Sequence, residues 1–176
     1  MRIISGKYRG RKLKEFDLST TKPTLDRVKE SIFNLIQFDV DGAVVCDLFS
    51  GTGAFGLECV SRGAKQVFLV DSNPNAIKLI NDNSKGMEGN FKIINKDYMQ
   101  FLSSCPTCDL FLLDPPYKTE FGKLAIDYII NNSKLNDGGK IIFETSKDLD
   151  FTFNYPTFEI DRRDYGTVSV YKFTKK

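Results

Sequence analysis

The sequence predicts an α/β fold in which helices cover both faces of a mostly parallel sheet. Apolar runs of strand length alternate with helical patterns from residue 43 to residue 145, which is the order expected of successive β-α units. The apolar runs are nearly continuous, as in parallel strands that are buried on both faces. Residues 158–173 form two further runs around Tyr165-Gly166, and this pattern predicts a C-terminal antiparallel hairpin.

The N-terminal part of the chain is expected to form an arm followed by one helix. Residues 1–14 alternate weakly around Gly6 and Gly10, which is typical of a short hairpin or an irregular arm. A helix is expected to follow with Thr24 as its N-cap. Its apolar residues recur at helical spacing and form one stripe: Leu25, Val28, Ile32, Leu35 and Ile36. Three charged residues lie off that stripe: Arg27, Lys29 and Glu30.

The parallel sheet is then expected to be built in chain order. The predicted strands are residues 43–49, 67–70, 91–94, 109–113 and 141–143. The predicted helices are residues 54–62, a helix capped by Asn73 with Pro74 at its first position, a short helix after Asp97, and residues 120–132. The chain is expected to break near Asp137-Gly138-Gly139 before the fifth strand.

Composition limits the possible functions. With 176 residues, 41% hydrophobic and 27% charged, the chain has the size and make-up of one globular domain. No membrane-spanning run and no apolar leader is evident, which predicts a cytoplasmic protein. The chain has no histidine, which excludes histidine bases, histidine metal ligands and Ser-His-Asp catalysis. We expect no metal site.

Charge is concentrated at the N-terminus. Residues 1–14 hold six of the 25 basic residues and no acid, which gives this segment a charge of +6. The remainder carries 19 basic and 23 acidic residues, a charge of −4, and the two parts sum to the net charge of +2. A basic segment with an aromatic residue suits a phosphate backbone, although a solvated tail has the same composition. We therefore divide the chain into a basic arm plus helix (1–40) and an α/β domain (41–176), which is a single structural unit. The candidate RNA contacts are Lys7, Arg9, Arg11, Lys12 and Arg27.

The four cysteines raise the question of a redox or zinc site, because Cys105 and Cys108 have CxxC spacing. A thioredoxin-type pair follows a strand and opens a helix, whereas this one follows a helix and opens a strand. Cys46 and Cys59 lie in a strand and a helix and do not form a second zinc-binding pair. We interpret all four as reduced thiols, mostly buried.

A glycine motif follows the first buried strand. Gly51, Gly53 and Gly56 match GxGxxG, and Asp71 lies 20 residues after Gly51. This spacing is the dinucleotide fingerprint, in which glycines admit the ligand and the acid binds ribose hydroxyls. Nicotinamide dinucleotides and S-adenosylmethionine (SAM) both fit it. Asp47, four residues before Gly51, favours SAM, because SAM carries a sulfonium and an ammonium rather than a pyrophosphate.

A second motif follows the fourth strand: Asp114-Pro115-Pro116-Tyr117. Two prolines hold the backbone extended and leave carbonyls without neighbouring N–H partners. Such carbonyls and a carboxylate can bind both N–H groups of a planar amine and turn its lone pair toward a methyl donor. A tyrosine ring can stack on a base withdrawn from its neighbours. The pattern therefore predicts methyl transfer to an exocyclic amine.

These motifs, together with the opening segment Arg2–Leu13 and the segment Lys22–Glu30, resemble the RsmD family of bacterial rRNA guanine-N2 methyltransferases. The resemblance extends over nearly the whole chain. It implies a Rossmann-like class I methyltransferase fold with a seven-stranded sheet, SAM as cofactor, and 16S rRNA in the small subunit or an assembly intermediate as partner. The family's usual target is guanine 966.

On this basis each site residue is given an expected role. Asp114 and the Pro115 carbonyl orient the amine, while Pro116 shapes the turn and Tyr117 stacks on the base. Asp47 lies near the charged end of the cofactor, Asp71 binds its ribose and Asp97 its adenine amino group. The complete cofactor set is Asp47, Phe49, Gly51, Thr52, Gly53, Asp71, Ser72, Asp97 and Tyr98.

Three other functions fit parts of the sequence. A DNA adenine-N6 methyltransferase shares the Asp-Pro-Pro-Tyr motif but usually has a target-recognition region, for which 176 residues leave no room. A nicotinamide-dependent oxidoreductase would explain GxGxxG but not residues 114–117. A non-catalytic rRNA-binding factor would need no intact carboxylates at the strand ends.

Overall fold

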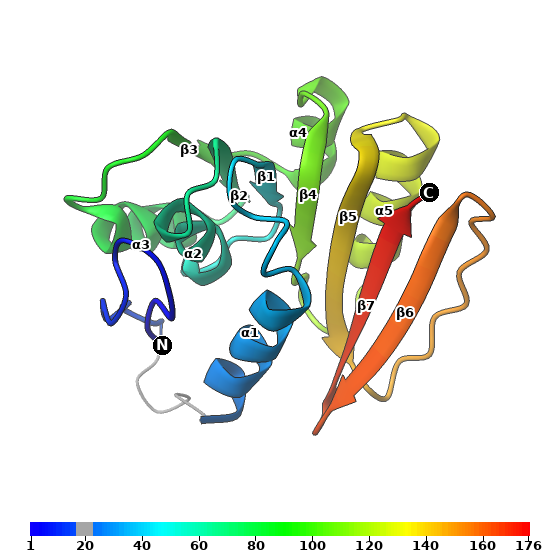
Figure 1. Cartoon of the computed structure of the whole chain (residues 1–176), viewed down its shortest axis with the longest axis horizontal. Coiled ribbons are helices and arrows are strands. Elements are labelled where there is room, and N and C mark those ends of the chain that lie inside the picture. Colours follow the sequence, from blue (N-terminus) through cyan, green and yellow to red (C-terminus); the bar gives the residue numbers. More distant parts are fainter. Residues whose placement is uncertain (17–22) are drawn as a thin grey trace.

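The computed structural model describes residues 1–16 and 23–176, and these contain a seven-stranded sheet in the order β3-β2-β1-β4-β5-β7-β6 (Figure 1). The strands are β1 (Val44–Asp47), β2 (Gln66–Asp71), β3 (Phe91–Asn95), β4 (Cys108–Leu113), β5 (Leu135–Ser146), β6 (Phe158–Tyr165) and β7 (Val168–Lys175). Strands β1 to β5 pair in parallel, and β7 pairs antiparallel with both β5 and β6. The predicted α/β sheet with its C-terminal hairpin is therefore confirmed.

The helices cover both faces of this sheet. They are α1 (Pro23–Leu35), α2 (Ala54–Ser61), α3 (Pro74–Ser84), α4 (Tyr98–Ser104) and α5 (Phe121–Asn131). Helices α1 to α3 contribute Ile32, Leu57 and Ile80 to one apolar core. Helices α4 and α5 contribute Phe101 and Ile126 to the core on the opposite face. Strands β1 and β4 are parallel neighbours, and the order in which the chain adds strands reverses between them. In sheets of this type such a switch point opens a site at the carboxyl edge.

Two predicted boundaries were wrong. Helix α1 begins at Pro23, so Thr24 lies inside it rather than at its cap; Lys22 lies outside the described residues. Strand β5 begins at Leu135 and continues through Gly138-Gly139, where a break was expected. Its register with β4 shifts between the pairs Cys108–Leu135 and Leu110–Lys140, and Gly138 takes φ +72°. A bulge with glycine at positive φ thus keeps the strand paired across a turn-like sequence.

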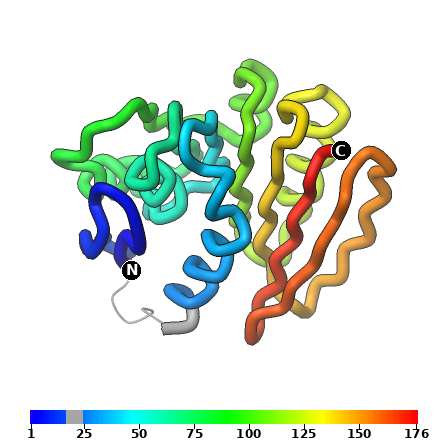
Figure 2. The backbone as a smooth tube through the Cα atoms, in the orientation of Figure 1, coloured from blue at the N-terminus to red at the C-terminus, as the bar shows by residue number. Residues whose placement is uncertain are grey.

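The N-terminal segment forms a compact arm docked on the domain (Figure 2). An isolated antiparallel bridge joins Arg2 to Lys12, as the hairpin prediction requires. Gly6 lies against the end of α2 at φ +85°, and a Cβ there would stand 1.9 Å from the Ser61 carbonyl oxygen. Only glycine permits this approach, so the arm is a docked element rather than a solvated tail.

A buried ion pair ties the arm to two helices. Lys29 on α1 and Glu58 on α2 are both fully buried, with Nζ 2.9 Å from Oε2. Glu58 also accepts hydrogen bonds from the backbone N–H groups of Ile4 and Ser5, and Lys29 Nζ donates to the Arg2 carbonyl. Lys29 was assigned to the polar side of its helix, but the docked arm covers it, because a buried charge needs such partners.

The four cysteines are free and buried, as predicted. Burial raises the pKa of the Cys46 and Cys59 thiols, which keeps them in the unreactive protonated form. Across residues 1–16 and 23–176, no helix combines the length and the apolar character needed to cross a bilayer.

Candidate active site

A cavity of about 550 Å³ lies at the carboxyl edge of the sheet, within the size range of small-molecule sites. Its wall at one end, the glycine-loop end, is made by the β1–α2 loop and the ends of β2 and β3. Its wall at the other, the proline-turn end, is made by residues 114–117 and Glu144 of β5. The predicted residues that line the cavity are Phe49, Gly51, Thr52, Asp71, Ser72, Asp97, Tyr98, Asp114, Pro115, Pro116 and Tyr117.

Glycines shape the loop at the first end. Gly51 and Gly53 have φ of +55° and +81°, which disfavours other residues at either position. Gly56, the third glycine of the motif, lies where a Cβ would meet Leu69 at 2.7 Å and the Asp47 carboxylate at 3.0 Å. It therefore allows α2 to pack closely against β1 and β2.

Asp71 at the end of β2 is held by the loop it faces. One carboxylate oxygen accepts the Gly51 N–H at 2.9 Å and the other accepts the Asn73 N–H at 2.8 Å. Each oxygen retains a further acceptor site. The carboxylate is thereby oriented by the backbone and can still bind hydroxyl groups in the cavity.

Asp97 has two uses. Its Oδ1 accepts N–H bonds from Met99 at 2.9 Å and Gln100 at 3.4 Å, so it caps α4. The residue also lines the cavity, which leaves Oδ2 for a ligand amine. Beside it, the rings of Phe49 and Tyr98 lie 5.1 Å apart between centroids, and Tyr98 and Phe121 lie 5.3 Å apart. These rings offer an apolar surface to a flat base.

Two residues of the predicted cofactor set lie behind the cavity wall. Gly53 faces Ile80 and Leu57. Asp47 is 2% exposed, and its Oδ2 accepts the Gly56 N–H at 2.8 Å. Burial raises the pKa of Asp47 to about 7 despite this bond. Asp47 therefore orders the loop from behind the cavity wall, and its place near the charged end of the cofactor stays a prediction.

The proline turn presents its carboxylate differently. Asp114 directly follows β4 and is exposed to the cavity, and Tyr117 is 48% exposed. Tyr117 Oη donates to Glu144 Oε1 at 3.3 Å. Glu144 is only 4% exposed and contributes to the cavity wall. Because Leu113 pairs with Phe143, Asp114 and Glu144 are neighbours at the ends of adjacent strands.

Glu144 was not predicted as a site residue. The apolar run Ile141–Phe143 marked the strand, and no motif marks the acid that follows it. The rule applied to Asp71 and Asp114, an acid directly after a buried strand, would have selected it.

The proximity of these acids changes their ionisation. Burial and then repulsion from Glu144 and Asp47 raise the pKa of Asp114 well above its usual range, even though its side chain opens to the cavity. Burial raises the pKa of Glu144 to about 7, against a smaller opposing effect of the Tyr117 hydroxyl. Such shifted carboxyl groups in a cavity are typical of functional sites.

The charge of the cavity distinguishes between cofactors. Among the described lining residues are five acids, Glu15, Asp71, Asp97, Asp114 and Glu144, and one lysine, Lys96. The N-terminal amine of Met1 also lies in this wall and pairs with Glu15. The remaining acids still outnumber the one lysine, which suits a sulfonium better than a pyrophosphate. The residues present therefore fit SAM better than a nicotinamide dinucleotide.

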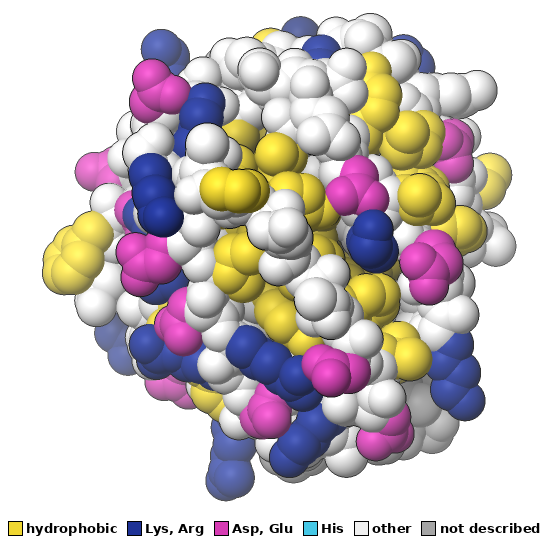
Figure 3. All heavy atoms as spheres, turned by 90° about the vertical axis from the view of Figure 1, so that its right-hand side faces the viewer, with side chains coloured by type: hydrophobic (Ala, Val, Ile, Leu, Met, Phe, Trp, Pro, Cys, Tyr) yellow, Lys and Arg dark blue, Asp and Glu magenta, His cyan; other side chains and the backbone are white. Residues whose placement is uncertain are grey.

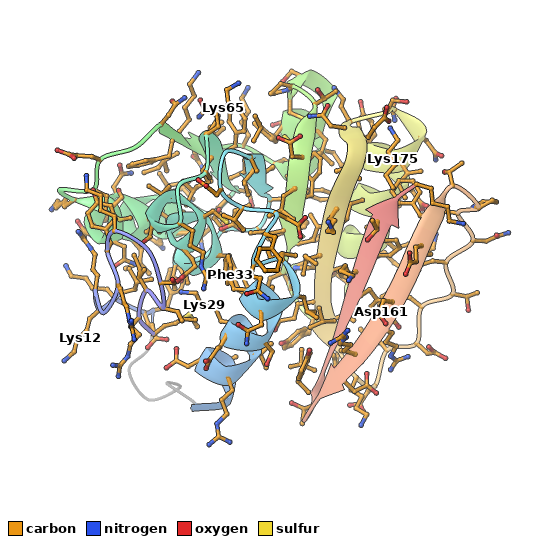
Figure 4. The ribbon with its side chains drawn as sticks, in the orientation of Figure 1. Lys12, Lys29, Phe33, Lys65, Asp161 and Lys175 are labelled. Carbon is orange, nitrogen blue, oxygen red and sulfur yellow. The ribbon has the colours of Figure 1, made fainter. Side chains whose placement is uncertain are left out.

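The five predicted RNA contacts lie outside the cavity wall. Lys7 pairs with Glu88 at an exposed position, and Arg11 donates to the Lys85 carbonyl. Arg9, Lys12 and Arg27 are exposed, and Figure 4 shows Lys12 extending away from the arm. The opposite side of the molecule, over β6 and β7, carries interspersed positive and negative side chains (Figure 3), including the pairs Arg162–Asp150 and Arg163–Asp161. The arm is thus the stronger candidate surface for phosphate.

Comparison with known proteins gives consistent matches over nearly the whole chain. The family model described as conserved hypothetical protein 95 matches residues 1–174. The Bacillus subtilis putative rRNA methyltransferase YlbH is 32% identical, and the match covers 100% of this chain and 100% of that protein. The Escherichia coli ribosomal RNA small subunit methyltransferase D is 33% identical, over 82% of this chain and 74% of that protein. The solved structure of Escherichia coli yhhF has a TM-score of 0.89 at 26% identity, covering 100% of this chain and 98% of that one.

Proposed function

The chain belongs to the RsmD family of rRNA methyltransferases, and from this premise we propose that it methylates the exocyclic N2 amine of a guanine in 16S rRNA, with SAM as donor. The family's guanine 966 is the proposed target. The observation that carries the proposal is the Asp114–Tyr117 turn, which faces the glycine loop across one acidic cavity. The proposed partner is the small ribosomal subunit or an assembly intermediate, in the cytoplasm.

The glycine-loop end would hold SAM. Asp71 would accept hydrogen bonds from its ribose hydroxyls, Asp97 would accept one from its adenine amino group, and Phe49 and Tyr98 would flank the adenine ring. Thr52 and Ser72 complete the wall, while Asp47 and Gly53 support the loop from behind. Bound SAM supplies a methyl group on a sulfonium centre, which leaves as a neutral thioether.

The proline-turn end would hold the guanine. Asp114 and the Pro115 carbonyl accept the two N–H bonds of the amine, and the exposed Tyr117 ring stacks on the base that has been turned out of the RNA. The two acceptors would turn the nitrogen lone pair toward the methyl group, so that the N–C bond would replace the C–S bond and one amine proton would pass to solvent. Positioning of this kind contributes about 7–11 kcal/mol to lowering a barrier.

The exposed arm residues Arg9 and Lys12, together with Lys7, Arg11 and Arg27, would bind RNA phosphates without reading sequence. Lys7 and Arg11 would exchange their present exposed contacts for phosphates.

Mass spectrometry of 16S rRNA from cells with and without this protein tests the proposal. The expected result is one N2-methylguanine present only with the protein, restored by the wild-type gene and not by an Asp114→Ala gene. Identical rRNA from both cells, or a methyl group on another atom, would contradict it.

A further inference from the structure

The carboxylate of Glu144 has no part in the scheme above, yet it lines the reaction cavity. It lies in the strand next to Asp114 and points to the same side of the sheet, since Leu113 and Phe143 are paired one residue earlier. Both acids, with Asp47, Leu112 and Ile142, also border a small space beneath the main cavity. Two carboxylates therefore stand side by side where the base is expected.

The described residues leave most acceptor positions of both carboxylates open. Within residues 1–16 and 23–176, Glu144 accepts a single hydrogen bond, the 3.3 Å contact from Tyr117, and Asp114 accepts none. An ionised carboxylate can accept about four hydrogen bonds. These open acceptor positions lie at the cavity wall, so the pair can bind a ligand that brings several N–H or O–H groups.

The bases differ in what they bring. Guanine presents two adjacent donor groups, N1–H and the N2 amine, on one edge. Adenine and cytosine each present one amine beside an unprotonated ring nitrogen, which is an acceptor. Two adjacent carboxylates match the first arrangement, and they place an anion against the lone pair of the second.

We propose that Glu144 selects guanine by accepting its N1–H while Asp114 holds the neighbouring N2 amine. This inference rests on the proposed function and deepens it, because it assigns the choice of base to one residue. Glu144 is therefore a specificity-determining residue, and Tyr117 helps to orient it through its hydroxyl. A site that leaves a charged group unpaired with the wrong substrate discriminates strongly, and this explains how one amine-methylating turn can refuse adenine.

The test removes the N1–H and keeps the 2-amino group. Small ribosomal subunits are reconstituted with 16S rRNA ligated to carry either guanine or 2-aminopurine at the position that the wild-type enzyme methylates. 2-Aminopurine keeps the 2-amino group but has an unprotonated N1 and no O6. The missing O6 affects every enzyme variant alike, so the change in ratio between variants reports on N1. At pH 8.5, where Glu144 is ionised, we expect kcat/KM of the wild-type enzyme on guanine to exceed that on 2-aminopurine by ~100-fold, the effect of one hydrogen bond to a charged group.

The variant Glu144→Gln carries both a donor and an acceptor, so it should reduce this ratio to ~10-fold or less by pairing with either base. Glu144→Asp keeps the carboxylate and should retain the preference for guanine at a lower rate. The matched control is Glu159→Gln on β6, an exposed position, which should leave the ratio unchanged. Binding of SAM and thermal unfolding report whether each variant is folded.

The outcomes separate the two claims. A wild-type enzyme that methylates both RNAs equally, or a folded Glu144→Gln enzyme with the wild-type ratio, would overturn the role of Glu144 and leave the proposed function intact. Methylation of neither RNA, or at an atom other than N2, would instead refute the proposed function. If Glu144→Gln does not fold, the wild-type ratio and that of Glu144→Asp still decide the question.

Discussion

The glycine-loop end and the proline-turn end of the cavity both carry acids, but the acids are bonded differently. Asp71 and Asp97 each accept two backbone N–H bonds, so folding orients them before any ligand arrives. Asp114 and Glu144 have raised pKa values. Among the described residues, Glu144 accepts one hydrogen bond, from Tyr117, and Asp114 accepts none. One end is thus stabilised by folding, whereas the other is left for the substrate to complete. This contrast is typical of sites where function opposes stability.

The largest effect is expected at the proline turn. Asp114→Ala should lower methyl transfer by at least ~1000-fold, because the amine loses its anionic acceptor and its alignment. SAM affinity should stay within about threefold of wild type, since Asp114 lies at the other end from Asp71 and Asp97. Single-turnover kinetics and calorimetric SAM binding measure the two effects. An active Asp114→Ala enzyme would remove this residue from the mechanism.

A change at the glycine-loop end should have the reverse profile. Asp71→Ala removes the acceptor of ribose hydroxyls and releases the Gly51 and Asn73 N–H groups. We expect SAM affinity to fall ~100-fold, with much of the rate recovered at saturating SAM. Asp161→Ala, an acid on β6 paired with Arg163, is the matched control. Unchanged SAM affinity for Asp71→Ala would contradict the assignment of SAM binding to the glycine-loop end.

Stability should change with opposite sign at the two ends. Burial raises the pKa of Glu144 from its ordinary 4.5 to about 7, so its carboxylate destabilises the fold progressively from about pH 4.5 to pH 7 and fully above that. Glu144→Gln should therefore raise the free energy of unfolding by roughly 1–3 kcal/mol at pH 8 and little at pH 4. Denaturant unfolding at both pH values measures this.

The matching variant at the other end is Asp97→Ala, which removes the α4 cap and should cost about 1 kcal/mol at pH 8. A Glu144→Gln protein that is less stable than wild type at pH 8 would show that the Glu144 carboxylate does not lower the free energy of unfolding.

The smallest effect is expected outside both ends. If the cavity reads the base and the arm holds the RNA backbone, Arg9→Ala and Lys12→Ala should each flatten the salt dependence of RNA affinity by a slope of about 0.7–0.9. SAM affinity should not change. Binding measured from 50 to 200 mM salt tests this, with Lys65→Ala as a control far from the arm (Figure 4). Unchanged slopes would make the arm a purely structural element.

Sequence patterns predicted those parts whose cause is local. Buried parallel strands, the glycine loop and the proline turn each have a short signature, and each was found where expected. Strand β5 was cut short because its bulge at Gly138 depends on pairing with β4. Lys29 was assigned to a polar face because its partner Glu58 is remote in sequence, on another helix. Glu144 acquires its meaning only beside Asp114, which is brought to it by strand register.

A structure of the protein with S-adenosylhomocysteine and guanosine would test the central claim most directly. The account predicts ribose hydroxyls of the cofactor product on Asp71, and the guanine N2 on Asp114 and the Pro115 carbonyl with N1–H on Glu144. A guanosine bound away from residues 114–117, or with its amine turned from the cofactor sulfur, would contradict it.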